Sequence, residues 1–236
     1  QDWRLRSRGC RAAPCADEPP PQPSLPLSTS SSSTCRLEPA GRWMIVRNFI
    51  SEEERITLAR KVAAHAQRGE LSPNPCGPCR FYAKADDAPR VYVDALLERL
   101  TRRCERCLRL ENVPQDRILG RIISLIEPTG FIHRHTDAYD HGIPGSRPER
   151  HHMRCNIVVS LQHPSGRPVI EGEALDVNER DMWVFTASKS MHQTEPLQGR
   201  APRVVFGFGW SIDGDHVLRL PPDGTSWASG QGDPSV

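Results

Sequence analysis

The spacing of apolar residues changes along the chain, from a helical period before about residue 117 to the alternation of β-strands after it. In the first part, residues 42–50 form a short apolar segment typical of a strand, and two amphipathic helices are predicted over about 51–67 and 91–110. Ser51 precedes three glutamates, the pattern of an N-cap with a capping box, so the first helix is expected to begin there. Helices followed by a run of strands predict a helical layer on one face of a sheet.

From residue 117 onward, seven or eight short strands are predicted, with turn residues between them. They are expected at 117–126, 131–137, 154–162, 168–170, 174–177, 181–185 and 203–210. On the strand 154–162, Arg154 and Asn156 lie on one face and apolar residues on the other. On the strand 203–210, Arg203 and small residues lie on one face and larger apolar residues on the other. A polar inner face predicts a barrel whose interior forms a site. The expected fold class is therefore α+β and mainly β, a β-sandwich or jelly roll closed on one side by helices.

Composition divides the chain into three parts. Residues 1–41 are rich in proline, serine and threonine, which predicts a disordered, low-complexity leader. Residues 42–212 are expected to form the folded domain, with the barrel from about 117, and 213–236 a flexible tail. The arginines at positions 4, 6, 8 and 11, together with the serines of the leader, also fit an organellar transit peptide, whereas the acidic residues of the leader favour a plain flexible segment.

Charge and hydropathy limit the classes of partner. The formal net charge of +2 and the pI of about 8.2 are too small to indicate a surface for nucleic acid or anionic membranes. No run of about 18 or more apolar residues occurs, so no transmembrane helix is expected, and a soluble protein is predicted, with the cytoplasm favoured. The 236 residues suffice for one domain with a sizeable core, and their pattern does not specify an oligomeric state.

Two pairs among the eight cysteines have the spacing of a structural zinc site, Cys76-Gly-Pro-Cys79 and Cys104-Glu-Arg-Cys107. The second pair falls at helical spacing with three leucines, and buried cysteines on a helix behave as small apolar residues. We therefore favour inert or locally disulfide-bonded thiols over zinc bound by Cys76, Cys79, Cys104 and Cys107.

The strongest candidate chemistry lies in residues 131–137, where His135 and Asp137 stand two positions apart. On a strand, such residues point to the same face about 6–7 Å apart and can bind one ion. His192, far along the chain, supplies the third ligand of a 2-His-1-carboxylate iron site. His133 competes with His135 as a ligand, but only His135 is followed two residues later by an acid.

The order and spacing of His135-x-Asp137, His192 and Arg203 resemble those of the Fe(II)/2-oxoglutarate-dependent dioxygenases, over about residues 42–212. The resemblance implies a double-stranded β-helix, a cupin-like jelly roll, in which the triad holds Fe(II) at one open end. It also implies that 2-oxoglutarate and O2 bind there, and that Arg203 binds the far carboxylate of 2-oxoglutarate. A guanidinium suits this task because it can donate two parallel hydrogen bonds to a carboxylate.

Within that superfamily, the motif layout is similar to that of the aspartyl/asparaginyl β-hydroxylases. Ser124, eleven residues before the first histidine of the triad, and Arg154 and Asn156 on a later strand stand where those enzymes line their site. By this resemblance, Ser124 and Arg154 help to bind 2-oxoglutarate, and Asn156 is assigned to the same binding site. Two positions differ, since those hydroxylases have a glycine in place of Asp137 and a second histidine in place of Asn156. Many other superfamily members have a tyrosine nine residues before the first histidine, where this chain has Ile126.

The activity implied by the resemblance is hydroxylation of a C–H bond, with conversion of 2-oxoglutarate to succinate and CO2. The implied substrate is a peptide side chain, of the aspartyl/asparaginyl or prolyl type, or a small amino-acid-like metabolite. An alternative is a non-catalytic, cupin-like protein that binds a metal or ligand, but this alternative gives the keto-acid anchor Arg203 no purpose. A nucleic-acid demethylase of the same superfamily is disfavoured. Such enzymes have a similar triad, but they also have a second arginine six residues after the first, where this chain has Gly209.

Overall fold

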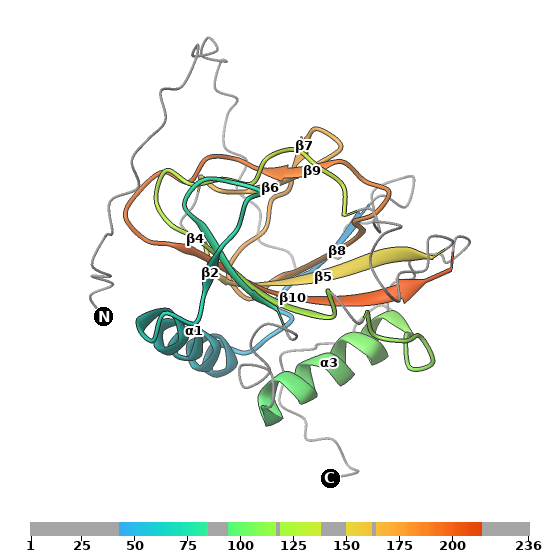
Figure 1. The fold of residues 1–236 in the computed structure, drawn as a ribbon. Helices are drawn as coiled ribbons and strands as arrows, with labels where there is room; N and C mark the ends of the chain where they lie inside the picture. Colours follow the sequence, from blue (N-terminus) through green and yellow to red (C-terminus); the bar gives the residue numbers. More distant parts are fainter. Residues whose placement is uncertain (1–42, 85–93, 117–118, 138–149, 162–163, 214–236) are drawn as a thin grey trace, which may run out of the picture. The chain divides into compact units, whose positions relative to one another are not determined.

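The computed structural model describes residues 43–84, 94–116, 119–137, 150–161 and 164–213, so the predicted leader and most of the predicted tail lie outside the described residues. Seven described strands form a larger sheet in the order β1-β8-β5-β10-β4-β3-β2, and three form a smaller sheet in the order β7-β6-β9 (Figure 1). Paired strands are antiparallel throughout. The strands are β1 (Trp43–Val46), β2 (Ser72–Pro73), β3 (Arg80–Lys84), β4 (Arg121–Ile126), β5 (His151–Ser160), β6 (Pro168–Ile170), β7 (Glu173–Ala174), β8 (Met182–Thr186), β9 (His192–Thr194) and β10 (Arg203–Ile212).

Two helices, α1 (Glu52–Gln67) and α3 (Ala95–Leu108), lie against one face of the larger sheet (Figure 1). The first begins at the predicted capping box: the Glu54 N–H donates to Ser51 Oγ (3.1 Å), and the Ser51 N–H donates to the Glu54 carboxylate (2.9 Å). Asp94 caps α3 by accepting hydrogen bonds from two backbone N–H groups of its first turn. The helical layer expected from the sequence is therefore confirmed.

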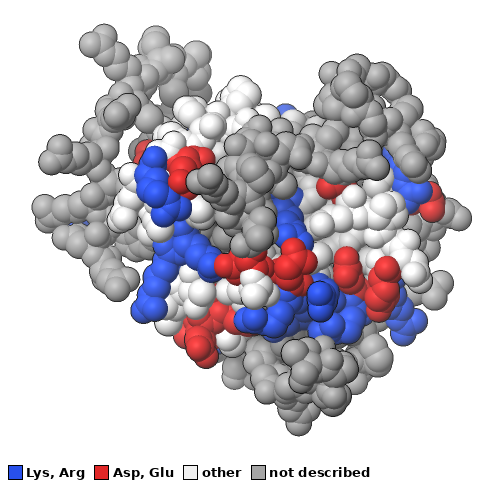
Figure 2. All heavy atoms as spheres, turned by 60° about the horizontal axis from the view of Figure 1, so that its bottom comes forward, with Lys and Arg blue, Asp and Glu red and all other residues white. Residues whose placement is uncertain are grey.

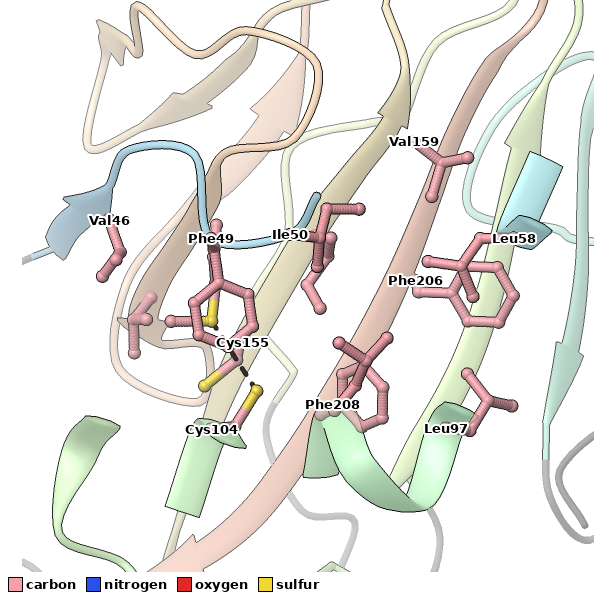
Figure 3. Close-up of a cluster of buried hydrophobic side chains, with 14 of the residues drawn as sticks. Val46, Phe49, Ile50, Leu58, Leu97, Cys104, Cys155, Val159, Phe206 and Phe208 are labelled. Carbon is pink, nitrogen blue, oxygen red and sulfur yellow. Dashed lines mark hydrogen bonds between the residues drawn. The ribbon is translucent and has the colours of Figure 1, made fainter. Parts of the chain in front are cut away.

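The main core lies between these helices and the larger sheet. Alternate residues of β5 and β10, such as Cys155 and Phe206, point into it together with Leu58 of α1 and Leu97 of α3 (Figure 3). Each of these four side chains is almost completely buried. The apolar faces predicted for the two longest strands are thus confirmed as their core-facing sides.

The four cysteines of the two C-x2-C pairs do not come together. Cys104 and Cys107 are buried on α3, where the Cys104 thiol lies 3.7 Å from the Met182 sulfur and close to the sheet residue Cys155 (Figure 3). Cys76 and its pair-mate lie half-buried in the loop between β2 and β3. In the part of the chain that the structure describes, every cysteine is a free thiol and none belongs to a cluster of three or more metal-ligating side chains. The described cysteines therefore do not form the four-thiolate cluster of a structural zinc site.

The opposite face of the larger sheet faces the smaller sheet across a second, smaller core. This core contains Trp183 and Phe185 of β8, Val205 of β10 and Ile170 of β6. The inward residues of β5 and β10, which the alternation predicted to be polar or small, line the space beside it. Two antiparallel sheets that enclose a partly polar interior confirm the expected jelly roll.

Several segments differ from the expectation. Residues 131–137 form no strand, and a single bridge between His135 and His192 joins them to β9. The strand expected at 174–177 is reduced to the two residues of β7, and the short strands β2, β3 and β9 are absent from the expected order. Strands of two or three residues, such as β2 and β9, carry too little alternation to be recognised from their pattern, and the five residues of β3 directly follow a loop rich in turn residues.

Basic and acidic side chains are interspersed on the face that Figure 2 presents, which carries the two helices. Arg103 of α3 pairs with Glu54 of α1 (2.8 Å), and Arg55 pairs with Glu52 within α1 (2.6 Å). The first pair ties the two helices together on the sheet. Neither described helix has the length and apolar run that crossing a bilayer requires.

Candidate metal centre and pocket

His135, Asp137 and His192 meet where the segment 131–137 runs beside β9. The backbone N–H of each histidine donates to the carbonyl of the other, at 3.0 and 2.8 Å, and the Asp137 N–H donates to Ala187 O at 2.9 Å. One ligand atom from each of the three side chains lies within 4.8 Å of the others. The backbone pairing thus brings together three side chains, two of them far from the third in sequence, in a cluster that can hold one metal ion.

The hydrogen bonds of the two imidazoles leave their Nε2 atoms directed at Asp137. His135 Nδ1 donates to His133 O (2.7 Å) and His192 Nδ1 donates to Ser190 O (2.9 Å), which sets the tautomer of each ring. Burial, above all, lowers the pKa of His192 to about 4, so this ring is neutral near pH 7. Its buried Nε2 has no hydrogen-bond partner and lies 3.8 Å from the Asp137 carboxylate. A lone pair that faces a carboxylate forms a position that a cation can fill, and two imidazoles with one carboxylate are the ligand set of a non-haem Fe(II) centre.

Asp137 is held in its ionised form by Arg154. The guanidinium Nη2 of Arg154 lies 2.7 Å from Asp137 Oδ2. Burial alone would raise the pKa of Asp137, but the charge of Arg154 and then the contact with His135 hold that pKa well below its usual range. The structure therefore places Arg154, which the sequence assigned to cosubstrate binding, on the metal-binding carboxylate as well as in the wall of the pocket.

A buried series of polar contacts supports Arg154 from behind. Its Nε donates to His152 Nε2 (3.4 Å), and His152 Nδ1 donates to Asp116 Oδ2 (3.1 Å). The His152 side chain is 0% exposed, and a Cβ at Gly209 would come within 2.4 Å of its ring. Glycine at this position therefore leaves room for His152, where an arginine, as in the demethylases considered above, would displace it.

Asp116→Asn is expected to weaken metal binding by about 10-fold, because partners that orient a ligand set contribute roughly 10–100-fold to affinity. The asparagine keeps the acceptor that Asp116 Oδ1 offers to the Leu119 N–H (2.8 Å), so only the charged contact to His152 changes. Metal affinity would be measured by anaerobic competition with a chelator. Asp213→Asn is the matched control, since Asp213 pairs with Arg150 (2.8 Å) at the surface. Equal affinities for wild type and Asp116→Asn, with equal thermal stability, would contradict the positioning role.

One pocket joins the metal centre to the inner face of the larger sheet. Its wall includes both triad histidines and the four residues predicted to bind the cosubstrate, Ser124, Arg154, Asn156 and Arg203. The apolar part of the wall comes from both sheets and consists of Ile122, Ile132, Pro168, Ile170, Trp183, Phe185 and Val205. Ser124 Oγ is buried and has no hydrogen-bond partner. The pocket thus combines a metal end with unsatisfied polar groups along one wall, an arrangement suited to a polar ligand.

Arg203 is the most deeply buried cation of the pocket, with 3% of its surface exposed. Its guanidinium carbon lies 5.5 Å from the centre of the Trp183 ring, and its Nε has no hydrogen-bond partner. Burial, and to a smaller extent the charge of Arg80, lowers the pKa of Arg203 to about 9. A buried guanidinium with an unused donor provides a site for an anion.

Arg80 is a pocket residue that the sequence did not reveal. It begins β3, is 7% exposed, and lines the same wall as Ser124 and Arg203. The sequence placed it at the end of a loop rich in proline, glycine and cysteine. The alternation of Arg80, Tyr82 and Lys84 with Phe81 and Ala83 is the signal that indicates a strand with a polar face.

Neither a protein-family model nor a curated protein sequence matches the chain. Solved structures with a similar fold include a prolyl-4-hydroxylase of Pseudomonas putida, which is 20% identical with a TM-score of 0.50 over 73% of this chain and 93% of that one. The non-haem α-ketoglutarate-dependent carbocyclase SnoK of nogalamycin biosynthesis is 12% identical with a TM-score of 0.55, over 73% and 80% of the two chains. The epimerase SnoN of the same biosynthesis is 12% identical with a TM-score of 0.50, over 79% and 87%. The chain therefore has the double-stranded β-helix fold of the Fe(II)- and 2-oxoglutarate-dependent oxygenases.

Proposed function

We propose that this protein is an Fe(II)- and 2-oxoglutarate-dependent oxygenase that hydroxylates a C–H bond of a peptide side chain or of a small amino-acid-like metabolite. The observation that carries the proposal is the metal cluster itself. His135, Asp137 and His192 offer two nitrogens and one ionised oxygen within 4.8 Å, and the His192 Nε2 lacks any other partner. A ligand set confined to three side chains leaves positions on the ion for a keto acid and O2.

The residues of the pocket divide the binding task between them. His135, Asp137 and His192 would hold Fe(II), and bound iron would supply the oxidation of the substrate C–H bond, coupled to conversion of 2-oxoglutarate and O2 into succinate and CO2. Arg203 would bind the far carboxylate of 2-oxoglutarate through bidentate hydrogen bonds, and Ser124 Oγ would donate to the same ligand.

The remaining groups keep the site in its reactive form. Arg154 keeps Asp137 ionised and oriented, because it neutralises a carboxylate that burial would otherwise protonate. Trp183 and Phe185 form an apolar wall beside His192, and the Phe185 ring centre lies 4.9 Å from that of His192. Such a wall excludes water from the side of the metal that faces the core.

The substrate class is proposed from two kinds of structural neighbour. The Pseudomonas putida protein is a prolyl-4-hydroxylase, whose name indicates action on proline, whereas SnoK and SnoN act in the biosynthesis of a small molecule. The first neighbour supports a peptide side chain and the others support a metabolite. Both classes are therefore included in the proposal and separated by experiment.

The test is to load the full chain with Fe(II) under anaerobic conditions, add 2-oxoglutarate and O2, and measure succinate. The reaction would be run alone and with panels of proline-, aspartate- and asparagine-containing peptides and of free amino acids. Succinate formation that requires Fe(II) and rises with one substrate class is the expected result. Absence of succinate, together with absence of Fe(II)-dependent binding of 2-oxoglutarate in calorimetry, would exclude the proposed activity.

A further inference from the structure

We propose that Arg80 is a second anchor for the far carboxylate of the cosubstrate, so that this carboxylate is held between Arg80 and Arg203 rather than by Arg203 alone. The inference rests on the proposed function, because it assigns a residue to the binding of 2-oxoglutarate. It is based on the register of the sheet, on the burial of the two guanidiniums and on the absence, among the described residues, of a carboxylate paired with either of them.

The register of the larger sheet places Arg80 and Arg203 in one row. On β10, Arg203 is paired with Ile126 of β4, and on the other side of β4 the same Ile126 is paired with Arg80 of β3. Residues in one row of a sheet point to the same face, so both arginines project into the pocket from either side of β4. Two neighbouring strand spacings separate their Cα atoms by about 10 Å, a gap that two arginine side chains can close around a carboxylate.

Neither guanidinium has a carboxylate partner among the residues that the structure describes. Arg154, by contrast, is paired with Asp137. Arg80 Nη1 donates to the neutral amide oxygen of Asn74 (3.2 Å), and the Arg80 guanidinium also contacts the Cys76 thiol. The Nε atoms of both Arg80 and Arg203 are buried without a hydrogen-bond partner. Buried charged groups are ordinarily paired with an opposite charge, so two guanidiniums in one pocket without a described carboxylate partner indicate that a ligand supplies the negative charge.

Arg80 lines the same pocket as Arg154 and Arg203, so three guanidiniums face one space. Burial and then the charge of Arg154 lower the pKa of Arg80, and the charge of Arg80 adds to the effect of burial in lowering the pKa of Arg203. An anion bound between Arg80 and Arg203 would relieve the repulsion between these two cations.

The chemistry of a carboxylate allows this shared binding. Its two oxygens offer about four lone-pair positions, enough for donors from two guanidinium groups. Ser124 Oγ, which also lacks a hydrogen-bond partner, lies two positions along β4 from Ile126 and therefore on the same face, paired with Val205 on one side and Tyr82 on the other. The end of the pocket between β3 and β10 is thus built to accept an anion with more than one oxygen.

The experiment compares two ligands on wild type and four variants of the full chain, Arg80→Met, Arg80→Lys, Arg203→Met and Arg102→Met. Dissociation constants of 2-oxoglutarate and of 2-oxopentanoate, which has the same carbon chain without the far carboxylate, would be measured by calorimetry on Fe(II)-loaded protein under anaerobic conditions. Arg80→Met is expected to weaken 2-oxoglutarate binding by about 10-fold or more, the effect of losing a charge-assisted hydrogen bond, and to leave binding of 2-oxopentanoate unchanged. Arg80→Lys keeps the charge and is expected to fall between Arg80→Met and wild type. Arg102→Met, an exposed change on α3, is the matched control and should behave as wild type.

The outcomes separate this inference from the function on which it rests. Equal weakening of both ligands by Arg80→Met would mean that Arg80 acts at the metal end and would overturn the inference. Unchanged 2-oxoglutarate binding, with a raised KM for the primary substrate, would assign Arg80 to that substrate and would also overturn it. If wild type binds 2-oxoglutarate and Arg203→Met alone loses it, only the inference fails. If wild type itself does not bind 2-oxoglutarate, the proposed function fails first.

Discussion

Replacing His192 by alanine is expected to abolish tight binding of Fe(II) and, with it, all turnover. His192 would contribute one of the two nitrogen ligands of the described cluster, and its Nε2 is already desolvated and has no competing hydrogen bond. Loss of a direct ligand should exceed the roughly 10–100-fold effect of losing a supporting residue, so the affinity is expected to fall by more than about 100-fold. The backbone bridge to His135 is unaffected by the substitution because it uses only main-chain atoms.

The matched control for this prediction is His133→Ala. His133 lies on the same segment, two residues before His135, and its side chain is exposed. Only its backbone carbonyl serves the site, by accepting from His135 Nδ1, and alanine keeps that carbonyl. Fe(II) affinity would be measured by competition with a chelator for both variants, with succinate formation as a second measurement. A similar loss in the two variants would show that the fold of the segment, rather than ligation by His192, is responsible.

Much of the larger sheet could be predicted because β5 and β10 are long and alternate clearly. Ten residues each are enough for a strict period of two, and the inner residues Arg154, Asn156 and Arg203 lie on the face that the pattern assigned to them. The start of α1 could be predicted for a different reason. A capping box is a local signal, complete within the four residues that begin with Ser51.

The parts that could not be predicted depend on contacts between distant residues. The segment 131–137 has strand-like composition, but its neighbour β9 offers only three residues, so one bridge forms instead of a ladder. Arg80 begins a strand of only five residues that directly follows a loop of turn residues, so its alternation is not separated from the loop in the sequence. Asp116 and His152 are 36 residues apart in sequence. Their contact also depends on Gly209 of β10, where the absence of a side chain leaves space for the His152 ring.

Spacing identified the members of the metal cluster, but not the partners that determine their charge. The sequence assigned Arg154 to the keto acid by resemblance, and the structure pairs it with Asp137. The aspartyl/asparaginyl hydroxylases, whose motif layout the sequence resembles, have a glycine in place of this aspartate. An arginine at the position of Arg154 would have no carboxylate to meet in such a layout, whereas in this chain it has one. The presence of Asp137 thus changes the task of its neighbour as well as the ligand set.

Arg203→Met is expected to weaken 2-oxoglutarate binding by more than about 100-fold while leaving Fe(II) affinity unchanged. A bidentate pair of charge-assisted hydrogen bonds contributes about 3 kcal/mol or more, which corresponds to this factor. Methionine retains an unbranched apolar stem against Trp183, so the packing of the site is conserved. The measurement is calorimetric titration of 2-oxoglutarate into Fe(II)-loaded protein, with Arg102→Met on α3 as the exposed control. Equal losses of metal and keto-acid affinity would contradict the assigned role.

The same substitution should raise thermal stability in the absence of 2-oxoglutarate. Arg203 is a buried cation without a described anionic partner, and burial already lowers its pKa to about 9. Removing an uncompensated buried charge relieves its desolvation penalty, whereas an arginine that served the fold would be paired, and its loss would destabilise the protein. A higher melting temperature together with weaker 2-oxoglutarate binding is therefore the result expected of a residue kept for its ligand. A lower melting temperature in both the absence and the presence of 2-oxoglutarate would indicate instead that Arg203 supports the sheet.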